Sequence, residues 1–162
     1  MAKNRSDAWE LAFETDPQGW RIMINSGAGW FIYNTGNENF SDTAIMPVNF
    51  EGLYDIQKLW PDSTATGNWT LHHHIYLLAR YENGSFSRYN KIKFLNYSDS
   101  TYTFYYEDLD RKDTVSILKD RQASFSYYSF SDRNQVYPEP DKAEYDLLFT
   151  SYYDRPTLFG QT

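Results

Sequence analysis

Hydrophobic and polar residues alternate with a period of two along most of the chain, and Gly, Asn, Asp and Pro interrupt the alternation at short intervals. A period of two places every second side chain on one face of an extended strand, so the pattern predicts antiparallel strands rather than helices. The sequence therefore predicts an all-β fold, an antiparallel sheet or sandwich built of hairpins and a meander. The predicted strands are 9–13, 20–24, 30–33, 69–81, 89–97, 102–106, 114–117, 125–131, 135–137 and 145–152.

Turn signals separate these strands. Asp16–Gly19 contains Pro, which presets one turn dihedral, and Gly, which supplies a positive φ. Asn83–Gly84 between two alternating runs is a strong signal for a two-residue hairpin, and Asp132–Asn134 marks a further turn. Apolar residues at helical spacing over Glu51–Trp60, followed by Pro61, predict one short helix.

Composition narrows the function classes. The chain has 15 basic and 22 acidic residues and a formal net charge of -7, which disfavours nucleic acid and anionic membrane surfaces as partners. Aromatic residues make up 19% of the chain, a share that suits pleated sheets. The absence of cysteine excludes disulfides, thiolate metal sites and a cysteine nucleophile. No apolar run is long enough to span a bilayer, and the first residues lack the apolar stretch of a secretory signal.

A five-position motif occurs twice in the chain. Trp9–Phe13 contains an aromatic residue, an acid, Leu, a small or apolar residue and Phe, and Tyr145–Phe149 repeats this order. The match reflects either two similar strands in an aromatic-rich β chain or a pair of tandem modules.

Asp7–Phe13 is followed by a predicted strand that ends in Asn25-Ser26-Gly27. These residues resemble the Trp-Asp-x-Ala-x element and the following Asn-x-Gly of the HmuY-like family, exported β-rich lipoproteins of Gram-negative bacteria whose founding member binds haem. Residues 75–106 are similar to its closing hairpin and last strand, and residues 125–150 resemble its opening strands. The resemblance covers most of the chain except about residues 38–66.

The resemblance implies a division of the chain. Residues 1–120 are expected to form one HmuY-like β module that lacks its first strands, and residues 121–162 the opening strands of a second, truncated module. The chain would then be a fragment of a tandem protein. Alternatively, residues 121–162 complete the first module as a permuted single domain, with Phe125–Val136 pairing within its sheet. That pairing would remove an exposed aromatic edge, which would otherwise favour aggregation.

The three histidines are consecutive, His72, His73 and His74, in a predicted strand. In a strand His72 and His74 share a face with Cα atoms roughly 7 Å apart, close enough to ligate one zinc or copper ion. The alternative is that they are ordinary amphipathic residues of a half-exposed strand. The family resemblance implies haem or a related porphyrin as cofactor, with these histidines as candidate ligands. Two histidines on one face cannot straddle a porphyrin, so at most one of His72 and His74 could be an axial ligand.

Aromatic side chains next to predicted loops form the second candidate site. Trp30, Tyr33, Trp60 and Trp69 could stack a ligand, or they could close the ends of the β core. No nucleophile elbow, HExxH helix or Walker loop is present, so we expect no enzyme.

Together these features predict a non-enzymatic binding module. Its partner is a small-molecule ligand, haem or a porphyrin by family resemblance, or alternatively a glycan or protein bound through exposed aromatics. The resemblance alone implies a cell-envelope or extracellular location, as an outer-membrane lipoprotein or a secreted protein.

Overall fold

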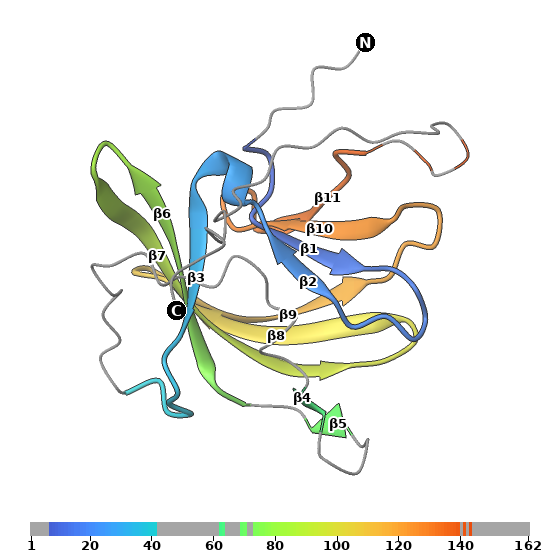
Figure 1. The fold of residues 1–162 in the computed structure, drawn as a ribbon, viewed down its shortest axis with the longest axis horizontal. Coiled ribbons are helices and arrows are strands. Elements are labelled where there is room, and N and C mark those ends of the chain that lie inside the picture. The colour runs from blue at the N-terminus through green and yellow to red at the C-terminus, as the bar shows by residue number, and fades with distance from the viewer. Residues whose placement is uncertain are drawn as a thin grey trace, which may run out of the picture.

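The computed structural model describes residues 7–41, 62–63, 69–70, 73–139, 141 and 143. In this part of the chain the strands form two larger antiparallel sheets that pack face to face, together with one two-stranded pair (Figure 1). The regular helical structure there is one 3-10 turn, η1 (Ser26–Ala28). The predicted all-β sandwich is therefore confirmed. The predicted helix at Glu51–Trp60 and the predicted strand at 145–152 lie outside the described residues.

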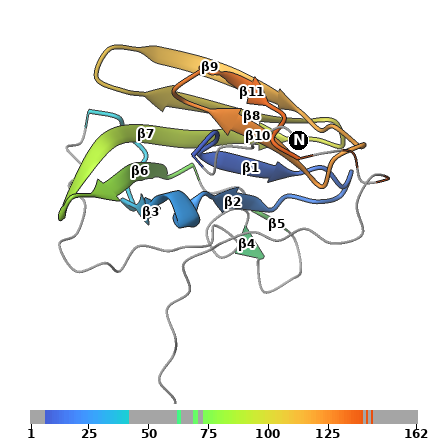
Figure 2. The ribbon, with the colours of Figure 1, turned by 90° about the horizontal axis from the view of Figure 1, so that it is seen from above.

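The four-stranded sheet joins the beginning of the chain to a segment much later in it. Its order is β11-β10-β1-β2, and its strands are β1 (Leu11–Glu14), β2 (Ile22–Ile24), β10 (Phe125–Ser129) and β11 (Asn134–Val136). β1 pairs with β2 on one side and with β10 on the other, where Leu11 lies opposite Tyr128 (Figures 1 and 2). β10 thus belongs to the same sheet as β1. The division into residues 1–120 and 121–162 stays a prediction.

The five-stranded sheet is mostly a meander. Its order is β3-β6-β7-β8-β9, and its strands are β3 (Trp30–Asn34), β6 (Ile75–Glu82), β7 (Ser85–Tyr97), β8 (Thr101–Glu107) and β9 (Lys112–Leu118). Asn83 and Gly84 connect β6 to β7 with φ of 53° and 83°, as a hairpin turn with two left-handed residues requires, so the predicted hairpin is confirmed. The small pair consists of β4 (Asp62–Ser63) and β5 (Trp69–Thr70).

Two predicted strands differ from the structure by more than two residues at one end. The strand predicted over 69–81 is divided, because β5 ends at Thr70 and β6 begins at Ile75. His73 and His74 therefore precede β6 and lie outside any strand. β7 begins at Ser85 instead of Tyr89, since its polar first half pairs with β6 through backbone hydrogen bonds that need no apolar side chain.

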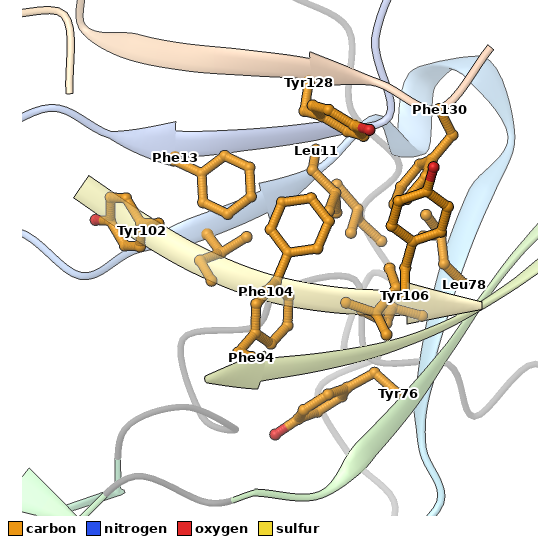
Figure 3. Close-up of a cluster of buried hydrophobic side chains, with 14 of the residues drawn as sticks. Leu11, Phe13, Tyr76, Leu78, Phe94, Tyr102, Phe104, Tyr106, Tyr128 and Phe130 are labelled. Atoms are coloured by element: carbon orange, nitrogen blue, oxygen red, sulfur yellow. The ribbon is translucent and has the colours of Figure 1, made fainter. Parts of the chain in front are cut away.

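Aromatic rings fill the space between the two sheets (Figure 3). Phe104 of β8 packs against Phe13 of β1 and Tyr128 of β10, with ring centroids 5.7 Å and 5.3 Å apart. Tyr106 of β8 meets Phe130 edge to face at 5.1 Å. These rings bury large apolar areas and pack in favourable edge-to-face or offset geometries. They therefore contribute most of the contact between the two sheets.

The connection from one sheet to the other is a tight turn that sets the position of Trp30. Asn25 caps η1, because its Oδ1 accepts from Ala28 N while its Nδ2 donates to Trp9 O. Gly29 follows with φ of 83°, and a Cβ at this position would lie 2.8 Å from Tyr81 O. Only glycine satisfies both the backbone conformation and the close approach.

One buried lysine fastens the β1–β2 turn to the five-stranded sheet. Lys119 Nζ donates to the carbonyl oxygens of Gly19 at 2.7 Å, Asp16 at 2.9 Å and Pro17 at 3.3 Å. The ammonium also lies 4.8 Å from the ring centroid of Tyr102, whose hydroxyl donates to Gly19 O at 2.8 Å. The lysine thus adds three charged hydrogen bonds to carbonyl oxygens of the turn, of which Asp16 O also accepts from Gly19 N and Gly19 O from Tyr102 Oη.

Replacing this lysine should destabilise the fold. Lys119→Met keeps most of the side-chain length but removes all three charged hydrogen bonds, so we expect a loss of about 2 kcal/mol in the free energy of unfolding. Lys112→Met is the matched control, because Lys112 is exposed and forms only an ion pair with Glu107. Urea unfolding measures both variants. Equal unfolding midpoints for the two variants would contradict the structural role of Lys119.

Candidate functional site

A cleft of about 440 Å³ opens where four chain segments from both sheets meet. The segments are the start of β3, the middle of β7, the β8–β9 turn and the β10–β11 turn. The cleft is lined by Trp30, Arg88, Tyr89, Asn90, Asp108, Leu109, Asp110, Phe130, Ser131 and Arg133. Because both sheets contribute, the cleft depends on the closure of the sandwich.

A β-bulge in β7 places two of these residues. Between the pairs Leu78–Asn90 and Arg80–Ser87, β6 has one residue and β7 has two, Arg88 and Tyr89. Arg88 has φ of 52°, a left-handed conformation that glycine usually supplies in such a bulge. Bulges re-aim side chains, and this one turns Arg88 and Tyr89 toward the cleft.

A second arginine on the cleft has the same unusual backbone. Arg133, in the β10–β11 turn, has φ of 54°. Among the described residues only Asn83, in a hairpin turn, is a further non-glycine residue with positive φ. A non-glycine residue in this region costs on the order of 1 kcal/mol and occurs preferentially at functional sites. Two such arginines on one cleft therefore mark it as a candidate site.

The β8–β9 turn contributes two carboxylates and one exposed apolar side chain. Asp108 Oδ1 accepts from Asp110 N at 2.8 Å, and Asp108 N donates to Arg111 O at 2.9 Å, so the turn is held by its own hydrogen bonds. Leu109 lies between the two aspartates and is 95% exposed. The turn thus presents acceptors and an apolar side chain at the rim of the cleft.

Tyr89 presents a fixed aromatic ring. The residue is 42% exposed, and its hydroxyl donates to Phe86 O at 3.0 Å, which holds the ring in one orientation. Trp30 and Phe130 are almost fully buried and form the apolar wall behind it. An exposed ring with a satisfied hydroxyl is ready to pack against a ligand without further ordering.

Glu10 lies beneath this wall. Its carboxylate is buried, and Oε2 accepts from Phe130 N at 2.7 Å across 120 positions of the chain. Burial raises the pKa of Glu10 to about 7, although the hydrogen bond from Phe130 opposes the shift. Asp132 raises the pKa further, whereas Arg88 and Arg80 lower it. Glu10 therefore changes charge near neutral pH directly behind the cleft.

The stability of the protein should depend on this titration. Folding raises the pKa of Glu10 from 4.5 to about 7, so its contribution is fully present below pH 4.5 and is lost as the pH rises through 7. Glu10→Gln keeps an oxygen acceptor for Phe130 N and does not titrate. Relative to this variant, the wild-type free energy of unfolding should fall by about 3 kcal/mol between about pH 4.5 and about pH 8. Urea unfolding across this range measures the difference, and a difference independent of pH would contradict the assignment.

Glu107→Gln is the control of opposite sign. Burial alone would raise the pKa of Glu107, but hydrogen bonds from Lys112 Nζ and Tyr105 Oη lower it below its usual value. Its contribution is therefore lost as the pH falls, the reverse of the behaviour expected for Glu10.

The predicted aromatic platform is not brought together as one surface in the described residues. Trp30 lines the cleft, but it is 3% exposed and forms its wall rather than a stacking surface. Tyr33 lies on the opposite face of β3, packed against Phe31 and its neighbours. Trp69 begins β5, and Trp60 lies outside the described residues.

His73 and His74 lie apart from the cleft lining. His72 is outside the described residues, His73 is exposed and His74 is half-buried. β6 begins only at Ile75, so His74 precedes the strand, whereas the shared face expected for His72 and His74 stays a prediction because His72 is not described. Asn34 Nδ2 and His74 Nδ1 are 3.2 Å apart, and since an amide nitrogen only donates, Nδ1 is the acceptor. No group of three metal-ligating side chains occurs among the described residues.

Most of the cleft residues were missed by sequence reasoning. Arg88, Tyr89, Asp108 and Arg133 lie in segments that the alternation pattern predicts as strand boundaries or turns. The sequence shows only short polar interruptions at these positions. Such interruptions do not distinguish a β-bulge from a regular strand, or a turn with a left-handed residue from a common turn.

No family model, curated protein or solved structure matches this chain. The resemblance to the HmuY-like family therefore stays a prediction. In the part of the chain that the structure describes, no helix is long and apolar enough to cross a membrane.

Proposed function

We propose that this chain is a non-enzymatic binding module that holds a saccharide in the cleft. The observation that carries the proposal is the β-bulge at Arg88–Tyr89, which presents a fixed, exposed tyrosine ring in a cleft lined by charged side chains of both signs. This is the glycan form of surface binding expected from the sequence, with Tyr89 in place of the predicted aromatics.

The chemistry of a sugar fits these groups. A pyranose has an apolar C–H face that packs against an aromatic ring, and a rim of hydroxyls that donate to carboxylates and accept from guanidinium groups. Tyr89 supplies the ring, Asp108 and Asp110 the acceptors, and Arg133 the donors. A few convergent polar groups beside an apolar wall are typical of small-molecule sites.

Binding is favoured over hydrolysis by the position of Glu10. Glycosidases need a carboxylic acid in contact with the glycosidic oxygen. Among the described residues, the carboxyl group whose pKa is raised to about 7 is that of Glu10, and it is 2% exposed and absent from the cleft lining. Neither His73 nor His74 lines the cleft, and the chain contains no cysteine.

Removing the exposed ring should weaken saccharide binding. We expect Tyr89→Ala to lower affinity about tenfold, because the ring would no longer pack against the sugar face. Tyr137→Ala is the matched control, since Tyr137 is 70% exposed and lies outside the cleft lining. A glycan array identifies binding oligosaccharides, and isothermal titration calorimetry compares the variants. The proposal would be refuted if the wild type binds no glycan on the array, or if Tyr89→Ala and Tyr137→Ala bind with equal affinity.

Haem binding by the histidine segment is the second candidate. It rests on the family resemblance and on the exposure of His73 next to the half-buried His74, which leaves both rings near the surface. The same resemblance supports a location in the cell envelope or outside the cell.

Haem titration followed by Soret absorbance checks this candidate. If the histidines bind haem, the wild type should show a saturable Soret shift that disappears when His72, His73 and His74 are all changed to Ala. Tyr89→Ala is the control and should leave the shift unchanged. The absence of a shift in the wild type would rule out haem.

A further inference from the structure

The guanidinium groups of Arg88 and Arg133 have unused hydrogen-bonding capacity. Arg88 Nε lies 3.9 Å from Glu82 Oε1, and Arg133 Nη2 lies 3.9 Å from Asp108 Oδ2. Both distances are too long for hydrogen bonds. The arginine side chains are 55% and 42% exposed, so their donors face solvent at the cleft. Each guanidinium has five N–H donors in a planar fork.

Each neighbouring carboxylate already accepts a hydrogen bond through one of its oxygens. Glu82 Oε1 accepts from Ser87 Oγ at 3.0 Å, and Glu82 Oε2 lies 3.5 Å from Arg80 Nε. Asp108 Oδ1 accepts from Asp110 N. Glu82 and Asp108 therefore attract the two arginine side chains by charge but accept no hydrogen bond from them.

The backbone at both positions indicates that an arginine side chain is needed there. Glycine would adopt φ of 52° and 54° without strain, whereas each arginine costs stability. Among the described residues this cost is offset only in part, by long and exposed ion pairs with Glu82 and Asp108. A ligand that binds the two guanidinium groups would offset the rest of this cost.

We propose that the saccharide bound in the cleft carries an anionic group, a carboxylate or a sulfate, that Arg88 and Arg133 bind, while its hydroxyls donate to Asp108 and Asp110. The inference rests on the proposed saccharide-binding function and specifies its ligand class. Guanidinium forks match the planar geometry of carboxylates and bind oxyanions bidentately. Asp108 and Asp110 then bind the neutral part of the sugar and balance the charge of the cleft.

The charge of the whole chain makes this binding diagnostic. A formal net charge of -7 repels anions in general. Affinity for an anionic saccharide that exceeds affinity for its neutral counterpart must therefore arise from a local cluster of cations. The preference should weaken with added salt, because exposed charges are screened.

The test compares three probes on the full chain by isothermal titration calorimetry. They are a galacturonic acid trimer, a neutral galactose trimer and a sulfated disaccharide of the heparin type. We expect at least one anionic probe to bind about tenfold more tightly than the neutral trimer at low salt, and the two anionic probes distinguish carboxylate from sulfate. Arg88→Gln and Arg133→Gln should each remove most of this preference. Arg88→Gln should leave binding of the neutral trimer within about twofold, whereas Arg133→Gln should also weaken it, because Arg133 donates to the sugar hydroxyls. Arg121→Gln, at an exposed position outside the cleft lining, is the matched control.

The outcomes separate the inference from the proposed function. Equal affinity for neutral and anionic probes, with sensitivity to Tyr89→Ala, would overturn the anionic ligand and leave saccharide binding intact. An anionic preference that persists in both arginine variants would also overturn the inference. If none of the probes and no glycan on the array binds, both proposals fail.

A second variant distinguishes binding from a structural role. Arg88→Gly relieves the left-handed backbone, so its melting temperature should equal or exceed that of the wild type, while the preference for the anionic probe is lost. A fall in melting temperature with the anionic preference unchanged would show that Arg88 serves the fold, and would overturn the inference.

Discussion

The pairing of β1 with β10 is the interaction on which the rest of the structure depends. It joins residues more than a hundred positions apart in the chain and gives the four-stranded sheet its centre. Without it, the short β1–β2 hairpin would have too little apolar surface to pack against the longer sheet. The same pairing brings Phe130 N to Glu10 and places the β10–β11 turn beside β7 and β8. The cleft therefore forms only when the β1–β10 pairing closes the sandwich.

The fold could be predicted from the sequence because its signals are local. In β8 every second side chain is buried, Tyr102, Phe104 and Tyr106, and this periodicity is visible in the residues themselves. The Asn83–Gly84 turn has the same property, since few other residue pairs adopt two positive φ angles. The pairing partner of β1 could only be offered as an alternative, because antiparallel pairing depends on backbone hydrogen bonds that carry no residue code across such a distance.

The candidate site could not be predicted because it depends on exceptions to these signals. Arginine has no preference for a left-handed backbone, so neither Arg88 nor Arg133 indicates its own conformation in the sequence. Tyr89 looks like an ordinary strand residue until the bulge shifts it relative to β6. Imidazole makes the histidines candidate ligands in any sequence, but this chemistry does not indicate that His73 and His74 lie outside a strand and away from the cleft lining. Trp30 is buried in the wall of the cleft, which fits the alternative that aromatic residues beside loops close the β core.

The cleft combines features that lower stability with a core that can compensate for them. A buried carboxylate and two arginines with left-handed backbone each lower the free energy of unfolding. The packed rings around Phe104 raise it, and they lie in the core rather than on the cleft surface. Glu10 and Arg88 are also coupled, because Arg88 lowers the pKa of Glu10 and an ionised Glu10 must in turn stabilise the positive charge of Arg88. Glu10 bridges β1 to the residue that follows β10, whereas Arg88 lines the cleft. The charge of Arg88 therefore bears on the ionisation of Glu10, whose carboxylate accepts from Phe130 N just after β10.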